Sequence, residues 1–119
     1  MKPKLESAYI SVENIDRALK FYEWFLNRSA IRKKDSLYLF NIDRFRLFLF
    51  DYKKENEETK YGNNCLLSFE VEDAAKIKEQ LENRGFKIVF PLTEILDNLV
   101  FEFQDTEGNH IEVYSQIYK

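Results

Sequence analysis

The sequence has little cysteine, glycine and histidine, and each shortage excludes a class of chemistry. Its single cysteine, Cys65, rules out an internal disulfide and a cluster of thiolate ligands. Cys65 has no basic neighbour in sequence, so we expect an inert thiol rather than a nucleophile. With 3 glycines and one histidine, the chain carries no phosphate-binding glycine loop, nucleophile elbow or Ser-His-Asp set. No apolar run approaches the length of a membrane-spanning helix. We therefore expect a cytoplasmic protein with no cofactor and no membrane partner.

Aromatic residues, by contrast, are abundant. The 119 residues include 11 Phe and 7 Tyr, and 16% of the chain is aromatic. These rings must either form the core or line a pocket. The length predicts a single domain. A net charge of -3 argues against non-specific binding of nucleic acid.

The chain begins with a strand and helix pattern. Residues 7–12 alternate apolar and polar side chains, which predicts a half-buried strand. Asn14 is placed to cap a helix that extends to about Leu26. One apolar stripe of this helix consists of Ile15, Ala18, Leu19, Tyr22 and Leu26. Three rings outside the stripe either extend the core or form a subunit interface: Phe21, Trp24 and Phe25.

The rest of the first half predicts shorter elements. The basic residues 28–34 predict a solvated edge strand or loop. Residues 37–40 and 46–50 predict two more strands. Residues 51–60 are charged and lack an apolar period, which predicts a linker or an excursion.

The second half repeats this order. A strand at residues 66–71 leads into a helix capped by Asp73, and Gly85 has the position of a glycine that ends a helix. Further strands are predicted at 87–90, 100–103 and 110–114, and Pro91 is expected to end the first of them.

The two halves match as an internal repeat. The segment from Ile10 to Asn14 corresponds to the segment from Phe69 to Asp73, and the two valines within them are 71 − 12 = 59 residues apart. The repeat predicts a single α+β domain of two βαβββ modules, which must pair because neither can bury its sheet alone. We place module one at about 5–54, a linker at about 55–63 and module two at about 64–117.

A β-hairpin is predicted near the end of the chain. Two alternating runs between Phe101 and Tyr114 flank a polar turn that contains Gly108-Asn109, a pair explained by turn geometry alone. One face of the hairpin is expected to carry Phe101, Phe103, Ile111 and Val113. The other is expected to carry Glu102, His110, Glu112 and Tyr114. A carboxylate in mid-strand, such as that of Glu112, calls for a reason.

The hairpin also carries a family resemblance. Asp105 to Glu112 resembles the Asp-Pro-x-Gly-Asn-x-Ile-Glu signature of the vicinal oxygen chelate superfamily, which includes glyoxalases, extradiol dioxygenases and bleomycin-resistance proteins. The run from Val12 to Tyr22 and the paired modules extend the resemblance over nearly the whole chain. It implies a glyoxalase/bleomycin resistance-like fold, in which the strands curl into a cup and the helices lie on the outer face. It also implies a homodimer, since one such chain leaves sheet edges open.

The resemblance implies up to four positions for metal ligands. Residue by residue, these fall on Ser7, Phe48, Leu66 and Glu112. Of the four, Glu112 alone has the chemistry of a ligand, and one carboxylate cannot hold zinc or iron well. This departure argues against glyoxalase or dioxygenase chemistry, and we expect no metal site.

The face away from the helices should be rich in rings and carboxylates. The residues expected to bind a ligand there are Tyr9, Arg46, Phe48, Phe50, Glu70, Glu102, His110, Glu112 and Tyr114. Rings with a few carboxylates suit a cationic or aromatic organic ligand. The leading hypothesis is therefore a metal-free small-molecule binding protein that resembles bleomycin-resistance proteins.

Several alternatives stay open at this point. Glu112 either pairs with Arg46 across the cup or, as the best catalytic candidate, acts as an acid or base. His110 is expected at a rim rather than in catalysis. If Phe48 and Phe50 fill the cup, the protein is a ligand-free structural or regulatory dimer. The remaining alternative is a lyase or oxidoreductase of the superfamily with a degenerate metal site.

Overall fold

The computed structural model describes residues 5–58 and 66–118. The chain divides into two compact units, residues 1–60 and 61–119, which we call module one and module two. Cys65 and part of the expected linker lie outside the described residues.

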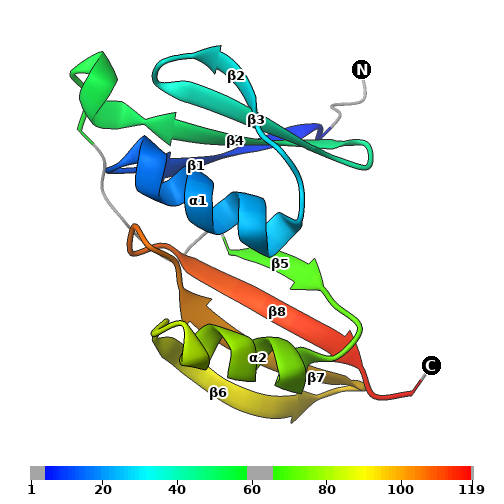
Figure 1. Ribbon diagram of the computed structural model, residues 1–119. Helices are drawn as coiled ribbons and strands as arrows, with labels where there is room; N and C mark the ends of the chain where they lie inside the picture. Colours follow the sequence, from blue (N-terminus) through cyan, green and yellow to red (C-terminus); the bar gives the residue numbers. More distant parts are fainter. Residues whose placement is uncertain (1–4, 59–65, 119) are drawn as a thin grey trace. The chain divides into compact units, whose positions relative to one another are not determined.

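Module one is a βαβββ unit followed by a short 3-10 helix (Figure 1). Its elements are β1 (Ser7–Val12), α1 (Ile15–Leu26), β2 (Ile31–Lys34), β3 (Leu37–Ile42), β4 (Phe45–Asp51) and the 3-10 helix Tyr52–Glu55. The strand order in the sheet is β1-β4-β3-β2. The β1–β4 pair is parallel, and the other pairs are antiparallel. As predicted, the basic strand β2 is an exposed edge.

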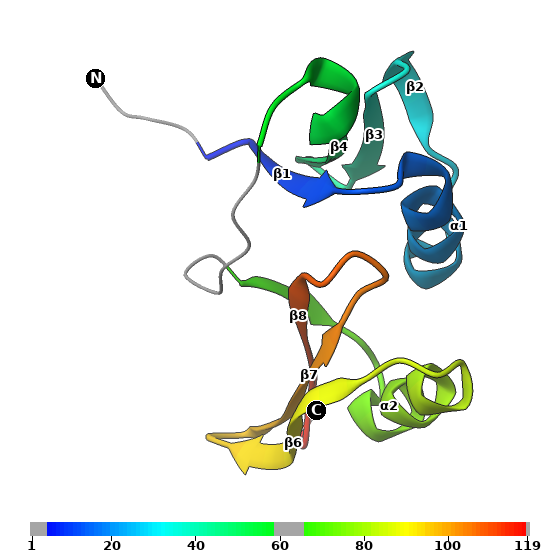
Figure 2. The ribbon, with the colours of Figure 1, turned by 90° about the vertical axis from the view of Figure 1, so that its left-hand side faces the viewer.

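Module two repeats this plan. Its elements are β5 (Leu67–Glu70), α2 (Ala74–Asn83), β6 (Ile88–Ile95), β7 (Asn98–Gln104) and β8 (His110–Gln116). The strand order is β5-β8-β7-β6, again with one parallel pair, β5–β8. Figure 2 shows that each helix covers one face of its own sheet. The α+β class and the two βαβββ modules are thereby confirmed.

The helix boundaries follow the predicted capping residues. The Asn14 side chain accepts a hydrogen bond from the Arg17 amide at 3.0 Å, and Asp73 accepts one from Lys76 at 3.1 Å. These contacts satisfy amides in the first turn that have no partner within the helix. Gly85 has φ of 86° and ends α2, as expected. Neither helix in the described part of the chain is long and apolar enough to cross a membrane.

The apolar faces predicted from alternation form the two cores. Module one buries Ile10, Val12, Tyr22, Phe40, Leu47 and Leu49, and module two buries Ala74, Leu81, Phe101, Phe103, Ile111 and Val113. Phe21 is also buried, which supports its role as an extension of the core. The rings of Trp24 and Phe25 pack beside it, with centroids 6.0 and 5.5 Å from that of Phe21.

The prediction of a linker or excursion at residues 51–60 is wrong for residues 51–55. Asp51 is the buried last residue of β4, and its Oδ1 accepts a hydrogen bond from the Lys54 amide at the start of the 3-10 helix. The Glu55 carboxylate contacts the region of the β2–β3 turn. It accepts a hydrogen bond from the Ser36 hydroxyl at 2.5 Å and forms an ion pair with Lys34 at 3.0 Å. Capping and these two contacts give order to a segment that lacks an apolar period.

The expectation that Pro91 ends a strand is also wrong. Strand β6 continues through Pro91 to Ile95. It lies at the edge of its sheet, and its register against β7 shifts between Phe90 and Thr93. Proline is tolerated at an irregularity of this kind in an edge strand, because its missing N–H removes no ladder hydrogen bond.

Candidate functional site

Each sheet has one face away from its helix, which we call the open face of that module. In module one, Tyr9 lies opposite Phe48 in the β1–β4 register. In module two, Ser68 lies opposite Glu112 in the β5–β8 register. Tyr9 and Ser68 are counterparts in the repeat, each three residues before the strand's valine. Phe48 and Glu112 therefore occupy corresponding positions on the two open faces.

The open face of module one is built around stacked rings. The ring of Tyr9 stacks on that of Phe48, with centroids 4.6 Å apart and planes at 17°. Phe48 is only 3% exposed, whereas Tyr9 is 59% exposed. Leu39 lies opposite Phe48 on the other side, in β3, and is also buried. Phe50 is partly exposed one position further along β4 on the same face.

Arg46 lies next to these rings, on the same face of β4 as Phe48 and Phe50. Its guanidinium lies 5.1 Å from the centroid of the Phe48 ring, within the range of a cation–π contact. Its Nη1 also lies 3.2 Å from a carboxylate oxygen of Glu6. The ion pair that the structure gives Arg46 is thus with Glu6, on the same module.

The open face of module two is acidic. Glu102 lies directly opposite Glu112 in the antiparallel β7–β8 pair, and both side chains are partly exposed. Like charges in directly opposing positions destabilise a sheet. A bound cation would remove this repulsion.

The other predicted residues of module two surround this acidic pair. His110 lies opposite Gln104, one position from the turn, and is partly exposed. Tyr114 lies beside Glu70 in the β5–β8 register. The Glu70 carboxylate accepts a hydrogen bond from the Gln116 side chain at 3.0 Å. The structure therefore brings Glu70, Glu102, His110, Glu112 and Tyr114 together on one sheet.

Asp105 fixes the turn that positions this hairpin. Its Oδ1 accepts hydrogen bonds from the amides of Glu107 and Asn109, each at 2.8 Å, and its Oδ2 accepts one from the Asn109 side chain at 3.1 Å. Gly108 has φ of 94°, a conformation that favours glycine. This role of Asp105 was not predicted from the sequence, although an aspartate at the start of a turn is a recognised signal.

The family's metal positions do not form a metal site in this chain. Ser7 and Phe48 lie on the open face of module one, Leu66 precedes β5, and Glu112 is on β8. Within residues 5–58 and 66–118, no group of three or more His, Cys, Asp or Glu side chains is placed to hold a metal ion. A hydroxyl, a phenyl ring and an isobutyl group are not donors for zinc or iron. The donor set therefore does not fit the metal.

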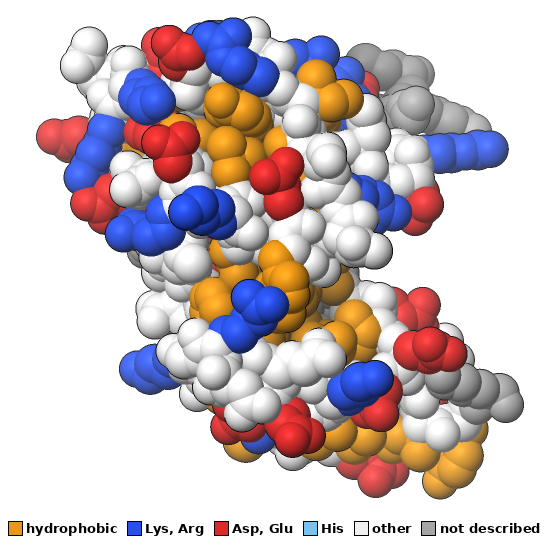
Figure 3. All heavy atoms as spheres, viewed as in Figure 1, with side chains coloured by type: hydrophobic (Ala, Val, Ile, Leu, Met, Phe, Trp, Pro, Cys, Tyr) orange, Lys and Arg blue, Asp and Glu red, His pale blue; other side chains and the backbone are white. Residues whose placement is uncertain are grey.

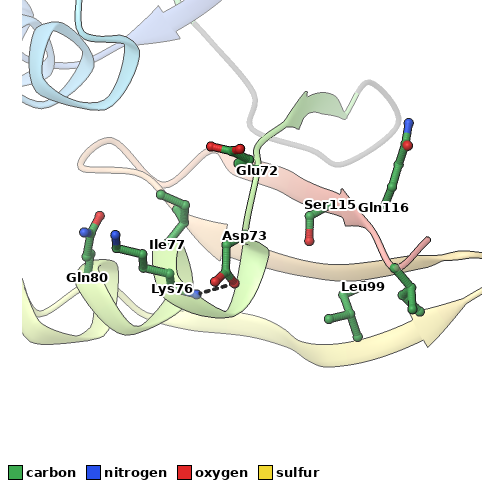
Figure 4. Close-up of a pocket in the computed structure, with 9 residues that line it drawn as sticks. Glu72, Asp73, Lys76, Ile77, Gln80, Leu99, Ser115 and Gln116 are labelled. Carbon is green, nitrogen blue, oxygen red and sulfur yellow. Dashed lines mark hydrogen bonds between the residues drawn. The ribbon is translucent and has the colours of Figure 1, made fainter. Parts of the chain in front are cut away.

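A hollow of about 730 Å³ lies elsewhere in module two, beside the start of α2 (Figure 4). Its lining residues are Glu72, Asp73, Lys76, Ile77, Gln80, Leu99, Ser115, Gln116 and Ile117. This hollow was not predicted from the sequence, because its walls come from α2, the start of β7 and the end of β8, which are far apart in the chain. The Asp73 carboxylate in its wall is engaged in capping the helix, as the dashed line in Figure 4 shows.

Two carboxylates of module one have lowered pKa values. The Ser36 hydroxyl and Lys34 lower the pKa of Glu55, and Arg32 lowers the pKa of Asp35. These groups surround the turn between β2 and β3 and the 3-10 helix. On the face seen in Figure 3, basic and acidic side chains are interspersed, which offers no broad cationic patch to a polyanion.

Comparison with known proteins agrees with the fold. Residues 4–113 match the model of the Glyoxalase/Bleomycin resistance protein/Dioxygenase superfamily. No curated protein matches the chain.

Solved structures share the fold. A protein from the mobile metagenome of V. Pseudocholerae is 24% identical, with a TM-score of 0.74 over 100% of this chain and 98% of its own. Lactoylglutathione lyase from Agrobacterium tumefaciens is 17% identical, with a TM-score of 0.72 over 96% of this chain and 94% of its own. A glyoxalase/bleomycin resistance protein/dioxygenase from Nocardioides is 13% identical, with a TM-score of 0.74 over 99% of this chain and 86% of its own. At these identities the likeness concerns the fold alone.

Proposed function

The chain belongs to the glyoxalase/bleomycin resistance protein/dioxygenase superfamily, and we propose that it is a member that binds an aromatic or cationic organic molecule without a resident metal ion. The observation that carries this proposal is the chemistry of the corresponding pair Phe48 and Glu112. One is a ring and the other a carboxylate, at two of the positions where the family resemblance implies metal ligands. The loss of donors removes the Lewis acid and leaves a surface of rings and charges.

Glu112 is the charged partner in this proposal. It faces Glu102 at the centre of a sheet face, and each carboxylate is only partly exposed to solvent. A cationic ligand placed between them gains two opposite charges and relieves the repulsion within the pair. The nearby ring of Tyr114, on the same strand and face, adds a surface for stacking or for a cation–π contact.

A homodimer is part of the proposal. The sheet of module one has β1 and β2 as its outer strands, and that of module two has β5 and β6. Outer strands carry backbone groups that can pair with a second chain, and two-fold dimers are the commonest arrangement of like subunits.

The test is an isothermal calorimetric titration of the full chain with 9-aminoacridine, which is a flat aromatic cation. We expect Glu112→Gln and Glu102→Gln each to weaken binding by about tenfold, since a charge-assisted contact contributes about 1.5 kcal/mol or more. Glu94→Gln is the matched control, because Glu94 is an exposed carboxylate on β6 of the same module. Equal affinity of wild type and Glu112→Gln would refute the role of the carboxylate.

A further inference from the structure

The exposed ring of Tyr9 is held in place for stacking. One of its faces lies against the buried Phe48, at a centroid distance of 4.6 Å. Tyr9 belongs to β1, an outer strand in the sheet of module one, and 59% of the residue is exposed. A ring already fixed by one neighbour loses little conformational entropy when a second flat ring stacks on it.

Next to the Tyr9–Phe48 pair, the same open face carries three side chains that can donate hydrogen bonds. Arg46 lies opposite Ser7 in β1 and opposite Asn41 in β3. A guanidinium, a hydroxyl and an amide thus stand side by side across three strands. Successive residues on one face of a strand are about 6.7 Å apart. This spacing suits a flat ring that carries an anionic group one or two bonds away from it.

Arg46 can exchange its present partner at little cost. Its ion pair with Glu6 has an N–O distance of 3.2 Å, and the two side chains are 48% and 45% exposed. Exposed ion pairs of this kind add little to stability. The planar guanidinium can bind an incoming carboxylate or phosphate through two parallel hydrogen bonds.

We infer that the open face of module one is a binding site for a planar aromatic anion, whose ring stacks on Tyr9 and whose carboxylate or phosphate binds Arg46. The site lies within one module and goes beyond the cation site proposed for module two. The row in module two that corresponds to Tyr9, Phe48 and Leu39 is Ser68, Glu112 and Glu102. The two open faces therefore select ligands of opposite charge.

The test compares three probes with the same ring system. Naphthalene-2-acetate and 2-naphthyl phosphate carry an anionic group, and 2-naphthaleneethanol is neutral. Each is titrated into the full chain, and binding is followed by calorimetry. We expect at least one anionic probe to bind about tenfold more tightly than the alcohol, and the tighter of the two identifies the preferred anion.

Variants assign the contacts. Tyr9→Ala should weaken binding of the anionic probe by about tenfold, whereas Tyr9→Phe should retain it, because the ring rather than the hydroxyl makes the contact. Arg46→Gln should remove the preference for the anionic probe over the alcohol. Tyr118→Ala and Arg44→Gln are matched controls, since both residues are exposed and lie off this row.

The outcomes separate this site from the one on module two. Glu112→Gln should leave binding of the naphthyl anions unchanged, while Arg46→Gln should not weaken binding of 9-aminoacridine. The inference is overturned if no anionic probe binds at millimolar concentration, if neither anionic probe binds more tightly than the alcohol, or if Tyr9→Ala and Arg46→Gln bind like wild type. The circular dichroism of each variant confirms that it is folded.

Discussion

Asp51 and Ser115 perform the same task at corresponding places in the two modules. Oδ2 of Asp51, at the end of β4, accepts a hydrogen bond from the Ile15 amide at 3.3 Å. The Ser115 hydroxyl, near the end of β8, accepts one from the Ala74 amide at 3.0 Å. Ile15 and Ala74 are the first residues of α1 and α2, and both acceptors are 3% exposed. Each helix is thus tied at its start to the last strand of its own module.

Removal of the Asp51 acceptor should destabilise module one. Asp51→Ala leaves the amides of Ile15 and Lys54 without this partner, and we expect the free energy of unfolding to fall by about 2 kcal/mol. Asp51→Ser should recover part of this loss, because module two uses serine at the corresponding position. Urea unfolding followed by circular dichroism measures both variants. Equal stability of Asp51→Ala and wild type would contradict the structural role.

Replacement of Asp105 should loosen the turn of the β7–β8 hairpin. Asp105→Ala removes the acceptor of three hydrogen bonds in a buried turn, so we expect a loss of about 2–3 kcal/mol. Asp105→Asn retains one oxygen and should lose less. The measurement is thermal unfolding of the three proteins at one pH. A larger loss for the asparagine variant would show that the oxygens are not the important atoms.

The Glu55 contacts should make stability depend on pH. The hydrogen bond from the Ser36 hydroxyl has the largest effect on the pKa of Glu55 and the contact with Lys34 the next, and both lower this pKa in the folded protein below its usual 4.5. A carboxyl group with a lowered folded pKa stabilises above its unfolded pKa, and this contribution is lost as the pH falls through the folded pKa.

Wild type should therefore exceed Glu55→Gln in stability at pH 7, and the difference should shrink below about pH 4.5. Urea midpoints at a series of pH values test this. Glu57→Gln, at an exposed neighbouring position, is the control variant. A difference that grows on acidification would reverse the sign and refute the argument.

Metal ions should have little effect on this protein. Because Ser7, Phe48 and Leu66 cannot act as donors, we expect added Zn²⁺ or Ni²⁺ to leave the unfolding temperature unchanged. Treatment with a chelator should likewise leave binding of 9-aminoacridine unchanged. Metal analysis of the purified protein completes the test. One tightly bound transition metal ion per chain would require the proposed function to be abandoned.

The proposed homodimer predicts a solution mass near twice the 14.4 kDa of the chain. Size-exclusion chromatography with light scattering measures this mass over a range of concentrations. Dilution should shift the protein toward the single-chain mass if the interface is of moderate affinity. A mass of one chain at every concentration would rule the dimer out.

Local patterns in the sequence predicted much of the fold. Asn14, Asp73 and Gly85 mark helix ends through contacts within a few residues, and alternation places Phe101 and Val113 in the core. Such interactions depend on neighbours in the chain, so a single sequence reveals them.

Interactions between distant residues were not predicted in the same way. The stacking of Tyr9 on Phe48 and the pairing of Arg46 with Glu6 depend on the parallel register of β1 and β4. The tie between Asp51 and Ile15 likewise joins residues far apart in sequence. No local periodicity encodes which strands become neighbours; the repeat and the family resemblance together predicted the two βαβββ modules.

The parallel pairing of the first and last strands in each module has a consequence for synthesis on the ribosome. Strand β1 cannot complete its pairing until β4 has been translated, because β4 lies between β1 and the rest of the sheet. Contacts of such long sequence separation slow folding. The partners of this pairing, and those of the Asp51 contact with α1, all lie within residues up to Glu55, so they are available before β5 to β8 have been translated.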